Sequence, residues 1–260
     1  MLRRLAPAGA FAAFLDARAV SIVGTCIGID YGGFAWIAMM LVDPAYRGRG
    51  IGRRLLEAAM DAVPAHLPIR LDATPLGRPL YRRYGFQDEA ALSRYIVDRD
   101  VVTLPNSDVP PAIRRLTRDD LELVIAQDRE TFGGTRDTLL DWMFRGAPEY
   151  AHAARNDDGR IHYCFGRQGR VFDQIGPVIA GDDAIAHALV KAALASGGDR
   201  RRAIDVYDCH CAFAAALRDD RFAVERPLFR MCRPAGSRAC NRSIGPGGVR
   251  EFTILGPEFA

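Results

Sequence analysis

A glycine-rich turn between a buried strand and an amphipathic helix constrains the fold of this 260-residue chain more than any other stretch. Residues 34–42 are apolar throughout, which is typical of a buried strand. Apolar residues then recur at helical spacing from Leu55 to Val63. The turn between them, residues 47–52, has three glycines in five residues, so backbone N–H groups at the helix start stay uncovered. With the helix dipole, this arrangement predicts a site for a phosphate or pyrophosphate group.

The spacing of this turn distinguishes between phosphate-binding motifs. No Gly-Lys-Ser/Thr follows it, and its third glycine is misplaced for a dinucleotide fingerprint. The sequence Arg47-Gly48-Arg49-Gly50-Ile51-Gly52 does fit (Arg/Gln)-x-x-Gly-x-(Gly/Ala), and it resembles the acyl-CoA loop of the GNAT superfamily of N-acetyltransferases. The stretch before it, residues 42–47, resembles the lead-in of that family, and residues 80–86 resemble its second motif. Taken alone, the loop also fits an ordinary tight turn between a strand and a helix.

The composition excludes several other classes of protein. The net charge of +3 is mild, and no basic stripe is interleaved with aromatic residues, so we expect no nucleic-acid partner. No apolar run approaches the length of a membrane span. The first fifteen residues imitate a weak signal peptide, but Pro7, Gly9 and several alanines make a poor apolar core. We therefore expect a cytoplasmic protein without a membrane partner, in the compartment where CoA is found.

Six scattered cysteines do not form a disulfide framework in a chain of this length. Cys209-His210-Cys211 does not have a zinc spacing, and no second pair is placed to complete a metal site. We expect buried thiols and no bound metal.

The order of elements along the first part of the chain supports the resemblance. Strands are expected at 9–16, 18–30, 34–42 and 69–73, a helix at 51–63, a short helix ending at Tyr84, and one or two strands in 86–97. This order, β-β-β-α-β-α-β, is that of the GNAT core, and the resemblance covers about residues 9–98. The two opening helices that wall the acceptor site in this family are missing. Either the chain is truncated at its N-terminus, or the wall comes from elsewhere; in the second case we expect a second unit, or a second copy of the chain in a homodimer, to supply it.

A second unit follows the polar, proline-rich stretch 99–111. Its expected elements repeat the first order, with two opening helices and a Thr117–Asp120 capping box. The phosphate loop is not repeated, because Gly181-Asp182-Asp183 stands in its place and the carboxylates repel a phosphate. One acyl-CoA site is therefore expected. The tandem order resembles a bacterial group of two-domain GNAT proteins with a degenerate C-terminal domain.

The predicted fold class is α/β (α+β), with two tandem GNAT-like domains, each a mixed, mostly antiparallel sheet flanked by helices. The expected boundaries are 1–98 for the acyl-CoA domain, 99–111 for a linker, 112–233 for the degenerate domain and 234–260 for a tail. Within the tail, residues 251–255 resemble a strand.

The resemblance implies direct transfer of an acyl group from CoA to an amine. It assigns cofactor contacts to Met40, Leu41, Val42, Arg47, Gly48, Arg49, Gly50, Ile51, Gly52 and Arg53. Tyr81, four residues before Gly85, is the candidate acid for the departing thiolate; the alternative is that its ring only packs beneath the cofactor arm.

The general base is not readable from the sequence. Asp30, Asp43, Asp72 and an ordered water are candidates, and so are three histidines of the second unit: His152, His162 and His210. The predicted function is an acetyl-CoA-dependent N-acetyltransferase acting on a primary amine of a small molecule. A non-catalytic acyl-CoA sensor or scaffold is the alternative class, and the apolar Met39-Met40 pair would also permit a longer acyl donor.

Overall fold

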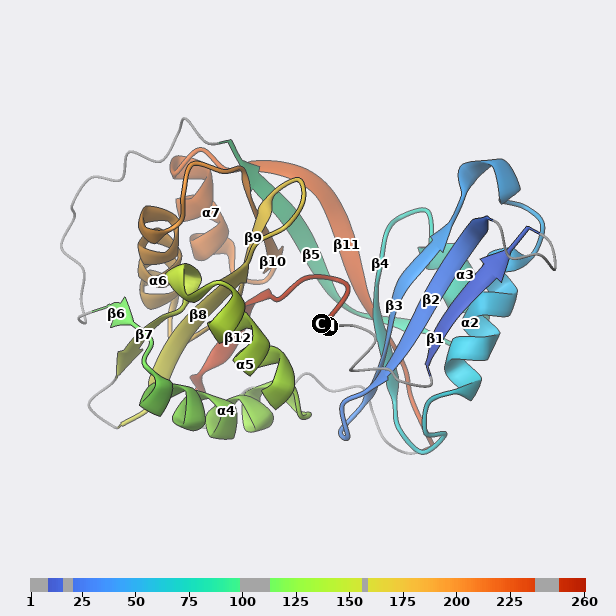
Figure 1. Ribbon diagram of the computed structural model, residues 1–260, viewed down its shortest axis with the longest axis horizontal. Helices are drawn as coiled ribbons and strands as arrows, with labels where there is room; N and C mark the ends of the chain where they lie inside the picture. Colours follow the sequence, from blue (N-terminus) through green and yellow to red (C-terminus); the bar gives the residue numbers. More distant parts are fainter. Residues whose placement is uncertain (1–8, 16–20, 99–112, 156–158, 237–247) are drawn as a thin grey trace. The chain divides into compact units, whose positions relative to one another are not determined.

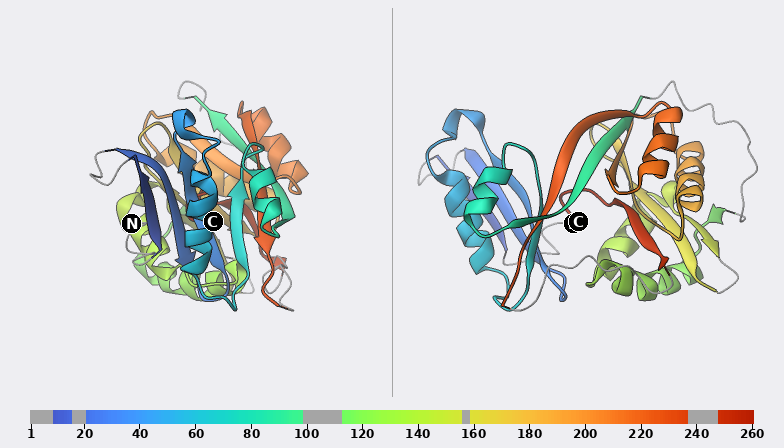
Figure 2. Two further views of the ribbon diagram at one scale, coloured as in Figure 1. Left: turned by 90° about the vertical axis from the view of Figure 1, so that its right-hand side faces the viewer. Right: turned by 180° about the vertical axis from the view of Figure 1, so that it is seen from behind.

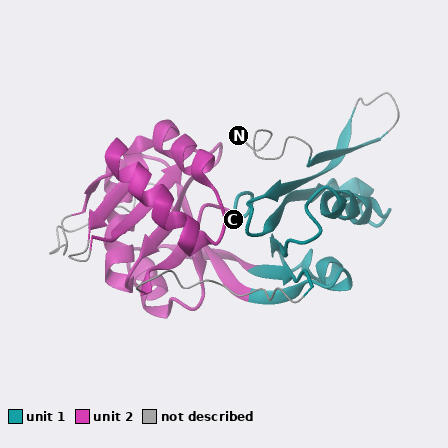
Figure 3. Ribbon diagram, turned by 90° about the horizontal axis from the view of Figure 1, so that it is seen from below, with its two compact units in different colours: residues 1–89, 229–241, 257–260 teal, residues 90–228, 242–256 magenta. Residues whose placement is uncertain are grey.

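The computed structural model describes residues 9–15, 21–98, 113–155, 159–236 and 248–260 (Figure 1). The chain forms two compact units, each assembled from separate segments (Figure 3). Unit 1 comprises residues 1–89, 229–241 and 257–260, and unit 2 comprises residues 90–228 and 242–256. This division differs from the expected consecutive segments 1–98 and 112–233. The expected linker, 99–111, lies outside the described residues.

Unit 1 has the element order that the sequence predicts. It contains β1 (Ala10–Phe14), β2 (Ile22–Asp30), β3 (Ala35–Val42), α2 (Ile51–Asp61), β4 (Ile69–Ala73) and α3 (Arg78–Arg83). Strands β1, β2 and β3 are antiparallel neighbours, and β3 pairs with β4 in parallel. Helices α2 and α3 cover the same face of this sheet (Figure 2), where Leu56 and Tyr81 join one core cluster with Ile37 and Leu71.

Unit 2 repeats this order with two additional helices. It contains β6 (Arg114–Arg115), α4 (Arg118–Phe132), α5 (Asp137–Gly146), β7 (His152–Arg155), β8 (Ile161–Arg167), β9 (Asp173–Ala180), α6 (Asp183–Ser196), β10 (Arg202–Tyr207) and α7 (Cys211–Asp219). The predicted capping box at the start of α4 is confirmed, because Thr117 and Asp120 exchange hydrogen bonds there. The first strand of this unit, β6, is shorter than the predicted strand at 112–116.

The two repeats exchange their closing strands. Strand β5 (Gln87–Val97) follows the first repeat but pairs antiparallel with β10 of the second. Strand β11 (Ala223–Arg233) follows the second repeat but pairs antiparallel with β4 of the first. The chain therefore passes between the units along these two long strands (Figures 1 and 3). This exchange explains why the compact units are not two consecutive segments.

Each exchanged strand brings an arginine opposite a buried aspartate. Arg230 of β11 lies opposite Asp72 of β4, and its Nε and one terminal nitrogen each donate to that carboxylate at 2.9 Å. Arg94 of β5 lies opposite Asp205 of β10 in the same way, with both donor–acceptor distances 2.8 Å. Asp72 lies in β4 and Asp205 lies in β10, which are equivalent strands of the two repeats. The two ion pairs are therefore equivalent features of the two units.

A further strand from the end of the chain, β12 (Arg250–Ile254), enters unit 2 between β9 and β10. Strands β9 and β10 pair in parallel only from Arg202 to Ile204. Beyond that point, Asp205 and Val206 pair with β12 instead, and β12 pairs with β9 on its other edge. The strand predicted within residues 251–255 is thus present, and it closes the gap between two diverging strands.

We expect Asp205→Asn to lower the free energy of unfolding by about 3–5 kcal/mol, because Arg94 would be left buried without a counter-charge. Urea unfolding of the full chain measures this change. The control is Arg118→Ala, which removes an ion pair with Asp141 whose arginine side chain is 64% exposed, and which should cost about 0–1 kcal/mol. Equal losses for the two variants would contradict a structural role for the buried pair.

Candidate acyl-CoA site

The glycine-rich turn leads from β3 into α2 with an open backbone. Gly48 and Gly50 have φ values of +76° and +77°, in the left-handed region that favours glycine. A Cβ atom at either residue would meet no heavy atom of the described residues within 4 Å, so none of them covers the turn on that side. The turn is therefore a concave stretch of backbone that can approach a ligand closely.

The first turn of α2 offers unused N–H groups. Its N-cap residue is Gly50, no side chain caps the helix, and no acidic residue lies in the first turn. The equivalent helix of unit 2 differs, because the Asp182 side chain accepts from the Ile185 N–H at 2.8 Å and Asp183 follows. An anion would find free donors and a favourable dipole at α2, but carboxylates already occupy the start of α6.

Side chains before the turn hold its shape. The Asp43 carboxylate accepts from the Ala45 N–H at 2.9 Å and caps the short 3₁₀ helix Pro44–Tyr46. The Arg47 Nε donates to the Val42 carbonyl at 3.2 Å, across the turn. The Arg49 guanidinium lies 5.2 Å from the centre of the Tyr46 ring. Arg47 and Arg49 therefore lie beside the open backbone, together with exposed Arg53 in the first turn of α2.

Strands β3 and β4 diverge beyond their paired residues, and this divergence, here called the slot, ends beside the turn. The two strands pair only at Ala35–Ile69 and Trp36–Arg70. Within the described residues, no strand occupies the divergence beyond Trp36, whereas β12 fills the equivalent place in unit 2. On its β4 side, β3 therefore has no ladder partner among the described residues from residue 37 to Val42, over roughly 20 Å at the usual rise of a strand.

An irregularity in β3 lies within this slot. Thr25 and Ile27 of β2 pair with Leu41 and Ala38, so Met39 and Met40 both stand opposite one residue of β2. Met39 has φ +51°, and its carbonyl accepts from the Thr25 hydroxyl at 2.8 Å. This bulge turns backbone groups of β3 away from the β2 ladder.

Tyr81 of α3 lies under the sheet, within the core cluster of unit 1. Its ring packs edge-to-face on Phe86, with centroids 5.9 Å apart, and against Gly77, where a Cβ would lie 3.1 Å from the ring. Burial and the neighbouring Cys26 raise the pKa of Tyr81, so its hydroxyl keeps its proton at neutral pH. Among the described residues, that hydroxyl has no hydrogen-bond partner. The structure shows the packing of the ring, and the acid role stays a prediction.

The carboxylates considered from the sequence serve other purposes. Asp30 and Asp43 accept backbone N–H groups of turns at 2.7 and 2.9 Å. Both oxygens of Asp72 accept from Arg230. That partner lies 158 residues away in the chain and cannot be identified from local sequence. The three candidate histidines are buried within unit 2; for example, the His210 ring stacks on Phe252, with centroids 4.0 Å apart.

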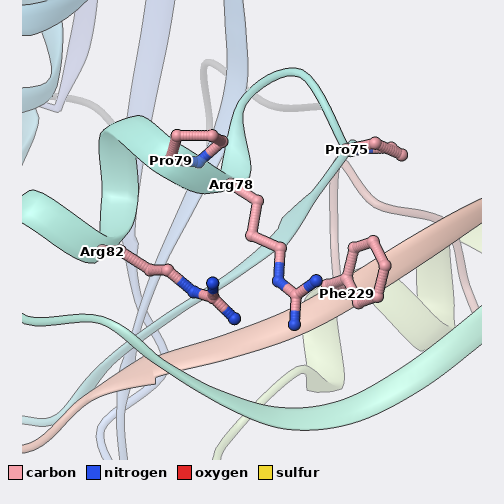
Figure 4. Close-up of a pocket in the computed structure, with 5 residues that line it drawn as sticks. All are labelled: Pro75, Arg78, Pro79, Arg82 and Phe229. Atoms are coloured by element: carbon pink, nitrogen blue, oxygen red, sulfur yellow. The ribbon is translucent and has the colours of Figure 1, made fainter.

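A pocket of about 400 Å³ lies on the outer side of α3, lined by Pro75, Arg78, Pro79, Arg82 and Phe229 (Figure 4). The Arg78 guanidinium lies 3.9 Å from the centre of the Phe229 ring, and both arginines bind Asp88. These two arginines hold the pKa of Asp88 down at about 2. Leu80, on the opposite side of the helix, is the residue that approaches Gly52 of the loop. The pocket is therefore separate from the slot and the loop.

The expectation of buried thiols holds for two of the described cysteines. Cys26 and Cys164 are buried, whereas Cys209 and Cys211 are exposed and Cys232 is disulfide-bonded. The expectation was wrong for Cys209 and Cys211, because apolar neighbours in the sequence do not determine which side of a helix end faces the interior. Cys232 is buried as expected, but it is not a free thiol. In the part of the chain that the structure describes, no group of His, Cys, Asp and Glu residues is arranged to hold a metal ion. No helix there is long and apolar enough to cross a membrane.

Comparison with known proteins agrees with this geometry. Family models described as acetyltransferase (GNAT) domains match residues 9–88 and residues 124–243. The chain therefore belongs to the GNAT acetyltransferase family and carries two of its domains in tandem.

Individual relatives fall in the same family. The uncharacterized N-acetyltransferase YitH of Bacillus subtilis is 29% identical over 195 residues, which are 74% of this chain and 68% of YitH. The holothin acyltransferase of a Pseudoalteromonas species is 28% identical over 62% of this chain, and the match spans about half (53%) of that protein. The crystal structure of a candidate acetyltransferase from Pyrococcus horikoshii superposes with a TM-score of 0.72 at 24% identity. This superposition covers 98% of this chain and 82% of the Pyrococcus horikoshii chain.

We expect Cys26 to resist alkylation in the folded protein. Burial raises the pKa of its thiol to about 12, so roughly one thiol in 10⁴ is ionised at pH 8. Peptide mass spectrometry after iodoacetamide treatment should find Cys209 labelled and Cys26 unlabelled, and both labelled in urea. Equal labelling rates in the folded protein would contradict the buried position of Cys26 beside Tyr81.

Proposed function

We propose that this protein is an acetyl-CoA-dependent N-acetyltransferase that modifies a primary amine of a small molecule in the cytoplasm. The observation that carries the proposal is the uncapped start of α2, with Gly48 and Gly50 open before it, at the end of an unfilled slot between β3 and β4. A helix N-terminus of this kind suits a pyrophosphate, and a free strand edge suits an extended chain with amide groups. Membership of the GNAT family supports both assignments.

The residues present fit the two ends of such a cofactor. The N–H groups of Gly48 to Arg53 would hold the pyrophosphate, with the charges of Arg47 and Arg49 beside it. The backbone of Met40, Leu41 and Val42 would pair with the pantetheine arm of CoA. Acetyl-CoA supplies an acyl thioester to this site. A backbone N–H of β3 next to the bulge would stabilise the oxyanion, which is typically worth ~10²–10³ in rate, and Tyr81 would give its proton to the leaving thiolate.

One acyl-CoA per chain is expected. In unit 2 the slot between β9 and β10 is filled by β12, and the helix start after it is occupied by Asp182 and Asp183. Strand β12 occupies backbone groups of β9 and β10 with which an extended pantetheine arm would otherwise pair. The two carboxylates repel a pyrophosphate. The amine is the only other substrate that we propose.

A longer acyl donor is the second candidate. Met39 and Leu41, beside the slot, are 37% and 57% exposed, and such apolar side chains would stabilise a longer acyl chain. The relative named holothin acyltransferase is named for acyl transfer in general. Thiol release from acetyl-CoA and from longer acyl-CoAs, with a panel of primary amines, tests both candidates and the non-catalytic alternative at once. If no acyl-CoA releases thiol with any amine, the protein is a binding module.

We expect Gly50→Asp to abolish acetyl-CoA binding, because it adds a carboxylate where the pyrophosphate would lie. Calorimetry on the wild type should give a stoichiometry of one, and on the variant no measurable heat of binding. The matched control is Gly32→Asp: Gly32 also has a positive φ (+80°) and open space at its Cβ position, but it lies in the turn between β2 and β3. A stoichiometry of two, or equal binding by the two variants, would refute a single site at the loop.

We expect Tyr81→Phe to lower kcat by ~10²–10⁴ with little change in acetyl-CoA affinity, the typical range for loss of a general acid. Burial raises the pKa of Tyr81 above the usual tyrosine value near 10, so its hydroxyl stays protonated at every pH below that value. The contribution of Tyr81 as an acid is therefore lost only at a higher pH. The control is Tyr84→Phe, since the Tyr84 hydroxyl binds Glu57 at 2.6 Å on the other side of α3. If both variants keep wild-type turnover in a single-turnover assay, Tyr81 serves packing alone.

A further inference from the structure

We propose that Glu89 binds the ammonium group of the acceptor and takes its proton before the amine attacks. This inference rests on the proposed function. It identifies Glu89 as the general base and specifies that the amine substrate binds as a positively charged ammonium ion. One carboxylate oxygen of Glu89 has no hydrogen-bond partner among the described residues.

Glu89 lies near the start of β5, and its side chain is 94% buried, with 6% of its surface exposed. One of its oxygens, Oε1, accepts from an Arg70 terminal nitrogen at 2.7 Å. The other oxygen, Oε2, is buried and has no hydrogen-bond partner among the described residues. Glu89 is therefore an oriented carboxylate with one oxygen free to accept.

Leaving a buried carboxylate oxygen without a hydrogen-bond donor is unfavourable, and most of all when the group is charged. Structures rarely keep such groups unless a ligand or water satisfies them. An ammonium group is the donor best matched to it, since it supplies both N–H groups and a positive charge. The unused oxygen therefore favours a cationic ligand.

The position of Glu89 relates it to the slot. Its partner Arg70 forms with Trp36 the last pair of the β3–β4 ladder before the strands diverge. Ile69 and Leu71, on either side of Arg70, pack in the cluster beneath α2 and α3, so Arg70 points to the opposite face of the sheet. Glu89 thus lies at the closed end of the slot, on the face that α2 and α3 do not cover.

In this proposal, acyl-CoA extends from the glycine-rich loop to the closed end of the slot, and the amine binds at that closed end. The pyrophosphate would lie at the loop, so the acyl group of an extended arm would lie toward the closed end, near Trp36 and Arg70. We place the acceptor at that end, on the face opposite α2 and α3, beside the Arg70–Glu89 pair. Charged groups of the described residues on this face include Arg70, Asp72 and Arg230, and Asp72 is paired with Arg230. Glu89 Oε2 is then the acceptor for a proton from the incoming amine.

The proposed step moves one proton. The N–H bond of an alkylammonium ion breaks, an O–H bond forms at Glu89 Oε2, and the nitrogen lone pair becomes free to attack the thioester carbonyl. Simple alkylamines have pKa values near 10, as lysine does, so they need this step at pH 7. An arylamine is already neutral at that pH and does not. The inference therefore specifies an alkylamine as the natural class of acceptor.

The test compares Glu89→Gln with the wild-type full chain, using acetyl-CoA with benzylamine and with aniline as paired acceptors. At pH 7 we expect kcat/KM for benzylamine to fall by about 10² or more, and kcat/KM for aniline to change by less than about threefold. The deficit with benzylamine should shrink as the pH approaches 10, because solvent then deprotonates the amine. The control is Asp88→Asn, since Asp88 adjoins Glu89 in β5 but binds Arg78 and Arg82 on the outer side of α3.

Two further measurements keep the outcome decisive. Glu89→Asp keeps the charge beside Arg70 if Glu89→Gln does not fold, and the shorter side chain should give an intermediate loss with benzylamine. Ligand-observed NMR with CoA present should detect benzylammonium bound to the wild type and not to the variant, without turnover. Equal losses for both acceptors, or unchanged benzylammonium binding, would overturn the role of Glu89. Absence of thiol release by the wild type, with benzylammonium binding intact, would instead overturn the proposed function.

Discussion

The buried pairs Arg230–Asp72 and Arg94–Asp205 define how this chain folds. In each pair, an exchanged strand delivers an arginine to the aspartate at the centre of a strand of the other repeat. Without its arginine, either aspartate would be a buried charge that lacks its counter-charge in the pair, which is strongly unfavourable. Since each partner comes from the opposite repeat, neither repeat completes its sheet from its own consecutive residues. The discontinuous units follow from this requirement.

The same architecture in two copies gives two different surfaces. Both repeats contain a pair of parallel strands that diverge and a helix that follows the first strand. In unit 2 the divergence holds β12, and Asp182 caps the helix, so its polar backbone groups are satisfied within the chain. In unit 1 the helix start has no side-chain cap, and the slot has no strand partner among the described residues. Unsatisfied donors and acceptors, rather than the fold itself, thus distinguish a candidate binding site from a structural domain.

The sequence predicted a large part of the fold and the local half of the site. The order of elements in both repeats, the capping box at Thr117 and the tail strand are present in the structure. The open conformations of Gly48 and Gly50 follow from residues adjacent in the chain. Residues whose role depends on distant partners were not predicted. The role proposed for Glu89 is not predictable from the sequence, because a single glutamate in a polar stretch normally indicates a solvated surface.

What the sequence determined by itself is local: periodicity sets strands and helices, and the glycines of the turn set an open backbone at a helix start, because both depend on neighbours a few residues apart. Only the tertiary structure decided which strand closes each sheet, which slot is filled, and which carboxylate keeps an unused oxygen. Those outcomes depend on pairings such as Asp72 with Arg230, separated by 158 residues. Hydrogen bonding and charge compensation between such residues are chosen by the packed fold, and no local pattern of side chains encodes them.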